Sequence, residues 1–312
     1  RDMELLHDLN SAQKEAVTFG EGPFLIVAGA GTGKTAVITR RIAWLIAQKR
    51  ARPEEILALT FTDKAASEME ERVDKLLPYG YVNLWVSTFH AFGERILRDW
   101  ALEIGLPNDF KVLTSSQQWM LVRNNLERFA LEYYRPLGNP TKFIHALLQH
   151  FSRAKDEMVS PEDYLKYAQS LALDKDSDTE TVSQLNEVAD TYHVYAQLLL
   201  EKGAFDFGDL INHTLTLLRK RPRVLNELRR RFKYILVDEF QDTNIAQYEL
   251  IKLLAAPANN LTVVGDDDQS VYKFRGASIS NILQFTRDFP DCKKVLLGTN
   301  YRSYQNILDT AH

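Results

Sequence analysis

Residues 24–35 read FLIVAGAGTGKT, and this stretch decides the fold. Its first four residues are an apolar run that predicts a strand, and residues 36–48, which follow the stretch, have the apolar spacing of a helix. Between them lies a glycine-rich loop of the kind that binds phosphate when it joins a strand to a helix. Backbone N–H groups and the positive end of the helix would then point at a bound anion. The stretch therefore predicts a nucleoside triphosphate site.

Each residue type in this loop has an expected role. Glycine permits φ angles and a close backbone approach that a Cβ would block. Lys34 would neutralise the β- and γ-phosphates, and the Thr35 hydroxyl would join the oxygen ligands of Mg²⁺. The alternative is a glycine-rich turn that binds no ligand. The predicted loop consists of Ala28, Gly29, Ala30, Gly31, Thr32, Gly33, Lys34 and Thr35, in which Ala28 replaces the usual leading glycine and must therefore keep a negative φ.

Length and composition are those of an ordinary globular protein. The 312 residues can form two domains, each with its own core, and the net charge of −4 predicts no global positive field. Any contact with nucleic acid must therefore come from a local patch. The single cysteine, Cys292, excludes an internal disulfide and favours a reducing cytoplasm. No apolar run approaches the length of a membrane span.

Apolar runs alternate with helical patterns at both ends of the chain, which predicts a parallel sheet with helices on its faces. Between them helical periodicity takes over, with a helix start at Ser160 and Pro161 and a polar loop over residues 174–180. The expected fold class is α/β: a parallel-sheet domain with a phosphate-binding loop, residues 1–106 and 204–312, and an all-α inserted subdomain, residues 107–203. The predicted strands are residues 24–27, 56–61, 82–87, 234–237, 261–264 and 294–297.

Two later strands are followed by polar residues that suit the same site. Asp238 and Glu239 follow the strand at 234–237, where Asp238 would hold Mg²⁺ directly or through water and Glu239 would orient and deprotonate the attacking water. The alternative is an acidic pair that faces solvent. The strand at 261–264 leads into GDDDQ, residues 265–269, where the Gln269 amide would sense the γ-phosphate. A capped loop is the alternative for this second segment.

Eight motifs occur in order along the chain: LNSAQ (9–13), AGAGTGKT (28–35), LTFTDKAA (59–66), VSTFHAF (86–92), FDFGDL (205–210), VDEFQD (237–242), GDDDQSVY (265–272) and NYRS (300–303). Together they resemble the UvrD/Rep/PcrA-like group of superfamily 1 DNA helicases over nearly the whole chain. The resemblance implies a RecA-like motor domain with a helical insertion. It also implies an ATP hydrolase that couples Mg²⁺-ATP hydrolysis to 3′-to-5′ movement on single-stranded DNA in DNA repair or replication.

The resemblance also implies further nucleotide contacts. Gln13 would read the adenine edge, although the spacing from Asn10 to Gln13 is also that of a helix capping box. Tyr301 would stack on the base, and Arg302 would be the arginine finger that stabilises charge in the transition state. Many relatives carry arginine directly after the loop threonine, whereas this chain has Ala36.

DNA contacts are implied on the same basis. Phe61, Tyr272 and Phe274 would stack on the bases, which accepts any sequence because every base has a π-face. Thr88 and His90 would touch the DNA backbone. The alternatives are that the aromatic residues belong to the core and that Thr88 only caps the following helix. The expected partners are single-stranded DNA and junctions between single- and double-stranded DNA.

Two rival functions stay open at this point. One is a P-loop ATPase that acts as a nucleotide switch or a small-molecule kinase without translocation, and the other is a DNA-binding module with a vestigial nucleotide site. Because the chain starts with Arg1 and stops inside a predicted helix, we expect a piece of a longer protein. Its partner would be the missing C-terminal second RecA-like domain, so the fragment would lack full helicase activity. The expected location is the cytoplasm, in association with the nucleoid.

Overall fold

The computed structural model describes residues 2–29, 31–77, 83–266 and 280–298. Compactness divides the chain into two units, which we call the sheet unit and the helical unit. The sheet unit comprises Arg1–Phe92, Pro222–Thr243 and Ile251–His312, and the helical unit comprises Gly93–Arg221 and Asn244–Leu250. The unit boundaries do not coincide with the domain boundaries expected from the sequence, and the assignment of domains stays a prediction.

The sheet unit contains six parallel strands, which confirms the predicted α/β fold class. Their order is β3-β2-β6-β7-β1-β8, so the first strand of the chain lies between two of the last. All six predicted strands are present, with bounds that move by a few residues. They are β1 (Phe24–Ala28), β2 (Ile56–Thr60), β3 (Trp85–Thr88), β6 (Tyr234–Val237), β7 (Leu261–Asp266) and β8 (Lys293–Leu297).

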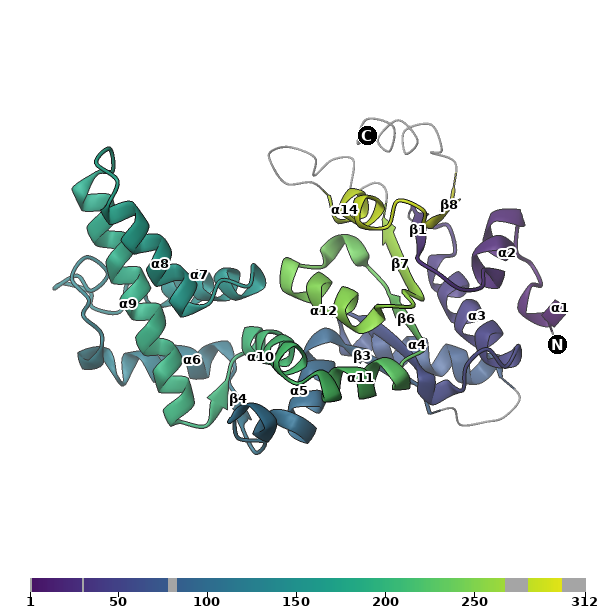
Figure 1. The fold of residues 1–312 in the computed structure, drawn as a ribbon, viewed down its shortest axis with the longest axis horizontal. Coiled ribbons are helices and arrows are strands. Elements are labelled where there is room, and N and C mark those ends of the chain that lie inside the picture. The colour runs from purple at the N-terminus through teal and green to yellow at the C-terminus, as the bar shows by residue number, and fades with distance from the viewer. Residues whose placement is uncertain (1, 30, 78–82, 267–279, 299–312) are drawn as a thin grey trace. The chain divides into compact units, whose positions relative to one another are not determined.

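Helices pack on this sheet, and Figure 1 shows α2 and α3 together on one side of the strands. Alternate strand residues explain this arrangement, since Phe24 and Ile26 join the core against α3, while Leu25 and Val27 are buried on the opposite face. The helices that contain sheet-unit residues are α1 (Asp2–Leu5), α2 (Ser11–Thr18), α3 (Lys34–Ala47), α4 (Asp63–Leu76), α5 (Phe89–Trp100), α11 (Pro222–Arg231), α12 (Ile245–Ala255) and α14 (Asn281–Asp288), with 3₁₀ turns η1 (Pro53–Glu55) and η4 (Phe240–Asp242). Residues of α5 and α12 belong to both units.

The helical unit is built mainly from helices, as predicted, but it also contains a two-stranded parallel pair. The helix predicted to start at Ser160 is confirmed, because the Ser160 hydroxyl accepts a hydrogen bond from Asp163 N at the start of α8. The end of the predicted loop is wrong: Asp178 caps α9, which begins at Thr179. The elements are α6 (Ser115–Arg123), α7 (Ile144–Asp156), α8 (Pro161–Ala172), α9 (Thr179–Glu201), α10 (Phe207–Lys220), η2 (Ala101–Ile104), η3 (Leu126–Arg128), β4 (Lys111–Val112) and β5 (Ala204–Phe205).

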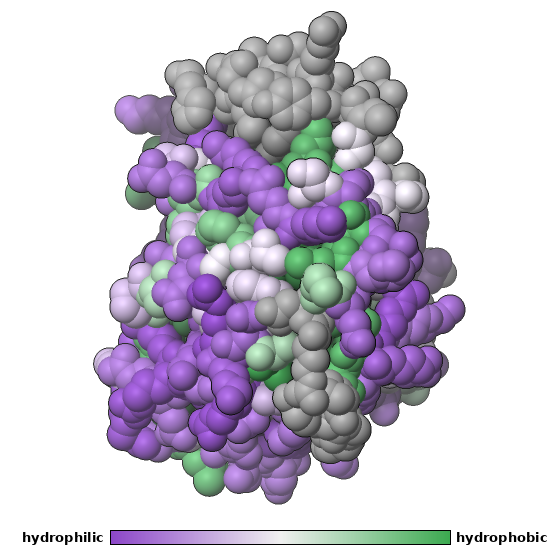
Figure 2. All heavy atoms as spheres, turned by 90° about the vertical axis from the view of Figure 1, so that its right-hand side faces the viewer, coloured by the Kyte–Doolittle hydropathy of each residue, from purple (hydrophilic) through white to green (hydrophobic). Residues whose placement is uncertain are grey.

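The surface of the described residues carries both hydrophilic and apolar side chains. Figure 2 shows that hydrophilic residues dominate the face on which α1, α2 and α3 lie, with apolar residues in smaller patches. Among the described residues, no helix combines the length and the apolar character that crossing a bilayer requires.

A buried arginine ties α3 to the end of α2. The Arg41 side chain is 1% exposed, and its guanidinium donates to the carbonyls of Phe19 at 2.5 Å and Gly20 at 3.3 Å and to the Thr262 hydroxyl at 3.1 Å. Burial lowers the pKa of Arg41, but the ring of Phe24, 5.1 Å from the guanidinium carbon, adds a favourable contact. The guanidinium also donates to the carbonyls of Ala16 at 3.4 Å and Val17 at 3.5 Å in the last turn of α2, where carbonyls have no partner within the helix.

We expect Arg41→Met to lower the free energy of unfolding by about 3 kcal/mol, because the buried carbonyls lose their donors while the side chain keeps its length. Urea denaturation followed by circular dichroism measures the change. Arg72→Met, at an exposed position of α4, is the matched control. Equal stability of the two variants would contradict the structural role of Arg41.

Candidate functional site

The loop between β1 and α3 has the backbone that a phosphate-binding loop requires. Gly31 and Gly33 both have φ of 75°, in the left-handed region that favours glycine. Ala28 ends β1 and is not among the residues with positive φ, which meets the condition set by its replacing glycine. The Thr32 hydroxyl donates to Gly29 O at 2.7 Å across the loop. The third predicted loop position, Ala30, lies outside the described residues.

Gln13 reaches this loop and also caps a helix. Its Oε1 accepts from Asn10 N at 2.9 Å, and Asn10 Oδ1 accepts from Gln13 N at 2.9 Å, which completes the capping box at the start of α2. The Gln13 Nε2 atom donates to Thr32 O at 3.1 Å. Gln13 therefore caps α2 and also contacts the phosphate-binding loop with the same side chain. Contact with adenine stays a prediction.

Lys34 meets the two acidic residues that follow β6. Its Nζ lies 2.5 Å from Glu239 Oε1 and 3.7 Å from Asp238 Oδ1. Strand β7 lies between β1 and β6, so the contact bridges the carboxyl ends of two strands that are not immediate neighbours. The acidic pair does not simply face solvent, because the Asp238 side chain is 11% exposed and both carboxylates contact the lysine.

The charges of this cluster perturb one another. Burial opposes the charge of Lys34, but the carboxylates of Asp238 and Glu239 outweigh it and raise the lysine pKa. Burial and the neighbouring Glu239 raise the pKa of Asp238. For Glu239 the hydrogen bonds from Lys34 and Gln241 exceed the effect of burial and lower the carboxyl pKa. A base kept ionised beside a phosphate-binding loop can accept a proton from water.

Two residues of the site were not assigned a role from the sequence. Gln241 Nε2 donates to Glu239 Oε2 at 2.6 Å, and Gln241 Oε1 accepts from Asp266 N at 3.0 Å, so one amide joins the ends of β6 and β7. Asn281 Nδ2 donates to Gln241 O at 2.9 Å and to Thr243 O at 2.7 Å, which fixes the turn that carries Gln241. For Gln241, the sequence indicated only that an amide side chain lies two positions after Glu239.

The residues expected to hold Mg²⁺ have the chemistry for it. In Asp238, Oδ1 accepts from Glu239 N at 2.8 Å, whereas no hydrogen bond to Oδ2 occurs among the described residues. The Thr35 hydroxyl likewise has no hydrogen-bond partner in the described part of the chain. No group of three or more His, Cys, Asp or Glu side chains that could hold a metal ion occurs there. A carboxylate oxygen and a hydroxyl are thus available for one Mg²⁺.

The described DNA-contact candidates follow two neighbouring strands. Phe61 comes directly after β2, and Thr88 ends β3, with Thr60 and Thr88 in register. The Phe61 ring is partly exposed and packs 5.3 Å from the ring of Phe89, which is 1% exposed, so Phe89 rather than Phe61 is the core residue. The Thr88 hydroxyl accepts from Ala91 N at 3.1 Å and therefore caps α5.

His90, in the first turn of α5, is partly buried, and burial lowers its pKa. A neutral imidazole can donate a hydrogen bond to a phosphate but adds no charge. Contact of Phe61, Thr88 and His90 with DNA stays a prediction. The remaining predicted site residues, Gln269, Tyr272, Phe274, Tyr301 and Arg302, lie outside the described residues.

Comparison with known proteins points to one family. The model of the UvrD/REP helicase N-terminal domain matches residues 9–290. The chain is 44% identical over 310 residues to the ATP-dependent DNA helicase PcrA of Bacillus subtilis (strain 168), covering 99% of this chain and 39% of that protein. It is 43% identical over 308 residues to the PcrA of Staphylococcus aureus (strain Mu50), covering 99% of this chain and 40% of that protein. The chain thus spans about two fifths of the length of these relatives.

The bridge made by Gln241 can be tested in the nucleotide-free protein. Gln241→Glu places a second carboxylate against Glu239, so we expect the titration midpoint of the Glu239 carboxyl to move to higher pH. Carbon-13 NMR of the side-chain carboxyls measures the midpoint. Gln241→Met removes both hydrogen bonds, and we expect it to lower the free energy of unfolding by about 1 to 2 kcal/mol.

Gln118→Glu, on α6 in the helical unit, is the control for the added charge. An unchanged Glu239 midpoint in Gln241→Glu would show that the Gln241 amide does not hold the carboxylate in solution.

Proposed function

Because the chain belongs to the UvrD/REP helicase N-terminal domain family, we propose that it is the ATP-binding motor part of a DNA translocase. The observation that carries the proposal is the contact of Lys34 with Glu239 at 2.5 Å and with Asp238 at 3.7 Å beside the glycine-rich loop. A phosphate counter-charge, a metal ligand and a base for water are the parts that hydrolysis of a nucleoside triphosphate needs. ATP is the nucleotide expected from the resemblance.

In this mechanism nucleotide binding changes the partner of Lys34. The incoming β- and γ-phosphates replace Glu239 at the ammonium group, and Glu239 is released to orient and deprotonate the attacking water. The hydrogen bond from Gln241 keeps the freed carboxylate in place. Asp238 and Thr35 would hold Mg²⁺, which when bound supplies positive charge to the phosphate oxygens.

On the DNA side, the proposal assigns Phe61 as a stacking residue and Thr88 and His90 as contacts to the DNA backbone. It is supported by the partial exposure of Phe61 above the buried Phe89. The Thr88 oxygen is used in the cap, but its hydrogen remains available for donation to a phosphate. Stacking is tolerant of sequence, as movement along DNA requires.

The finer parts of the proposal rest on the motif resemblance alone. They are 3′-to-5′ movement, action at single-strand to double-strand junctions, a role in DNA repair or replication, and work in the cytoplasm in association with the nucleoid. They also include a second RecA-like domain of the same protein, which would carry the opposing wall of the nucleotide site.

The deciding experiment is ATP hydrolysis by the full-length protein with and without single-stranded DNA. Stimulation by DNA supports a motor. Hydrolysis that is indifferent to DNA would instead favour a nucleotide switch or a small-molecule kinase. DNA binding that is equal with and without ATP and Mg²⁺, together with no hydrolysis, would favour a binding module with a vestigial nucleotide site.

We expect Lys34→Ala to weaken ATP binding at least about tenfold, because a charged hydrogen bond to phosphate is lost. Glu239→Gln should keep or tighten ATP binding, since it removes the competing carboxylate from Lys34, while hydrolysis stops for want of the base. Isothermal titration and a phosphate-release assay separate the two effects. Lys175→Ala, at an exposed position of the helical unit, controls for loss of charge.

The proposed division of roles fails if Glu239→Gln loses ATP binding as severely as Lys34→Ala. It also fails if Glu239→Gln hydrolyses ATP at the original rate.

We expect Phe61→Ala to weaken binding of single-stranded DNA by about 1 to 3 kcal/mol while the salt dependence stays unchanged, because stacking contributes no phosphate contact. Fluorescence anisotropy at several salt concentrations measures both quantities. Tyr167→Ala, an exposed aromatic residue of α8, is the control. Unaltered affinity in Phe61→Ala would remove this ring from the DNA interface.

A further inference from the structure

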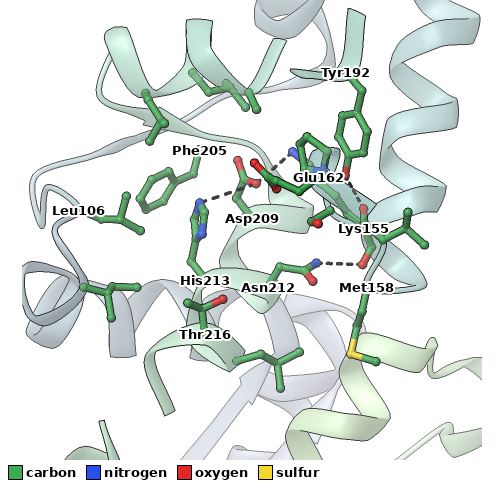
Figure 3. A pocket seen from close by; sticks show the side chains of 18 of the residues that line it. Leu106, Lys155, Met158, Glu162, Tyr192, Phe205, Asp209, Asn212, His213 and Thr216 are labelled. Carbon is green, nitrogen blue, oxygen red and sulfur yellow. Dashed lines mark hydrogen bonds and ion pairs between the residues drawn. The ribbon is translucent and has the colours of Figure 1, made fainter. Parts of the chain in front are cut away.

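The FDFGDL motif at residues 205–210 has no part in the nucleotide site or the proposed DNA contacts. In the helical unit two of its residues, Phe205 and Asp209, line a cavity of about 450 Å³. The walls come from η2, the turn between α7 and α8, α9, β5 and α10, and they are largely apolar, as Leu106, Leu199 and Phe205 illustrate. Figure 3 shows Leu106 and Phe205 on one side of the cavity and Met158 on another. Its volume lies in the range of small-molecule sites.

One face of α10 presents polar atoms to this cavity that the protein does not use. Figure 3 shows Asn212, His213 and Thr216 together on α10. The Asn212 amide nitrogen donates to Lys155 O at 2.8 Å, but among the described residues nothing donates to its oxygen. The His213 ring lies 3.8 Å from Asp209 Oδ1, beyond hydrogen-bond distance, and the Thr216 hydroxyl has no partner within the described ranges. A donor and an acceptor are therefore available side by side.

The charges around the cavity balance. Three cationic side chains line it: Lys155, Arg219 and Lys220. Two carboxylates, Glu162 and Asp209, also line it, and a third, Asp206, lies 2.5 Å from Lys155 Nζ, so the positive and negative groups are equal in number. Burial lowers the pKa of His213, so this ring adds no charge at neutral pH. No charged ligand is needed to compensate the site. The ring of His213 lies 4.7 Å from that of Phe205, which offers an aromatic wall to a flat molecule.

Met158 adds an independent observation. It follows α7 with φ of 60°, in the left-handed conformation that usually selects glycine at this position, with Met158 N donating to Lys155 O and Val159 N to Ala154 O. A methionine here costs stability, yet its flexible side chain lines the cavity. Lys49 has the same conformation without lining the cavity, so the position of the Met158 side chain in the cavity wall, and not its φ angle, is the observation that the inference uses.

We propose that this cavity binds a small neutral molecule with a flat apolar body and one edge that carries adjacent hydrogen-bond donor and acceptor groups, as in a heteroaromatic lactam. Asn212, His213 and Thr216 bind the polar edge, and Met158 closes over the apolar body. The site is separate from the phosphate-binding loop, so it stands whether or not the proposed motor function is correct.

The test uses 2-quinolone as the probe and the whole chain labelled at its methionine methyl groups. The chain has four methionines, so Met3, Met69 and Met120 act as internal controls for Met158. We expect the probe to shift the Met158 methyl resonance selectively, with the millimolar affinity of a small fragment. N-methyl-2-quinolone, which lacks the N–H donor, should bind about fivefold more weakly than 2-quinolone. His213→Phe should reduce the affinity for 2-quinolone by a similar factor.

Met158→Gly provides the sharper test, with affinity read from the ligand resonances. It should weaken 2-quinolone at least about threefold without lowering the melting temperature, because it relieves the backbone while removing the side chain. Lys49→Gly is the matched control: Lys49 has φ of 57° after α3 and the same pair of backbone hydrogen bonds, but lies in the sheet unit. It should leave binding unchanged. The proposal would be overturned if both His213→Phe and Met158→Gly bound 2-quinolone as tightly as the original chain. It would also be overturned if roughly 10 mM probe caused no selective shift of the Met158 methyl resonance.

Discussion

The ion pair between Lys34 and Glu239 is the contact on which the nucleotide site depends. It joins the loop after β1 to the turn after β6 across the intervening β7, so the two halves of the site are held together by a lysine already paired with the base. With side chains 19% and 39% exposed, the pair is accessible enough for a phosphate to compete for the ammonium group. In the proposed mechanism, binding of the anion and release of Glu239 as the base would be one event.

That arrangement requires an unfavourable backbone at Glu239. The residue has φ of 52° and ψ of 43°, a left-handed conformation that costs a non-glycine residue roughly 1 to 3 kcal/mol. The surrounding bonds maintain it: Gln241 holds the carboxylate, the carboxylate of Asp238 accepts from Glu239 N, and Asn281 fixes the turn that follows. In this conformation the Glu239 carboxylate contacts both Lys34 and Gln241.

Local patterns allowed the fold and half of the site to be predicted from the sequence. Each strand of the sheet is an apolar run long enough to be recognised, and FLIVAGAGTGKT specifies its loop by glycine spacing alone. The pair β4–β5 was missed because two-residue strands have no periodicity. Arg41 and Gln241 were missed for a different reason, since their partners Phe19 and Asp266 are identified only by tertiary packing.

Gln13 illustrates how hydrogen bonds within the chain can coexist with the proposed recognition of a base. Its oxygen is held by the cap of α2, and its nitrogen is held by Thr32 O in the phosphate-binding loop. An amide nitrogen has two hydrogens, so one donor remains for a purine acceptor without breaking either bond. In the proposed mechanism Lys34, in contrast, would exchange Glu239 for phosphate. Recognition of the base would therefore leave the existing hydrogen bonds intact, whereas recognition of the phosphates by Lys34 would require the ion pair to open. Under the proposed mechanism, water would then be activated only in the state with phosphate bound.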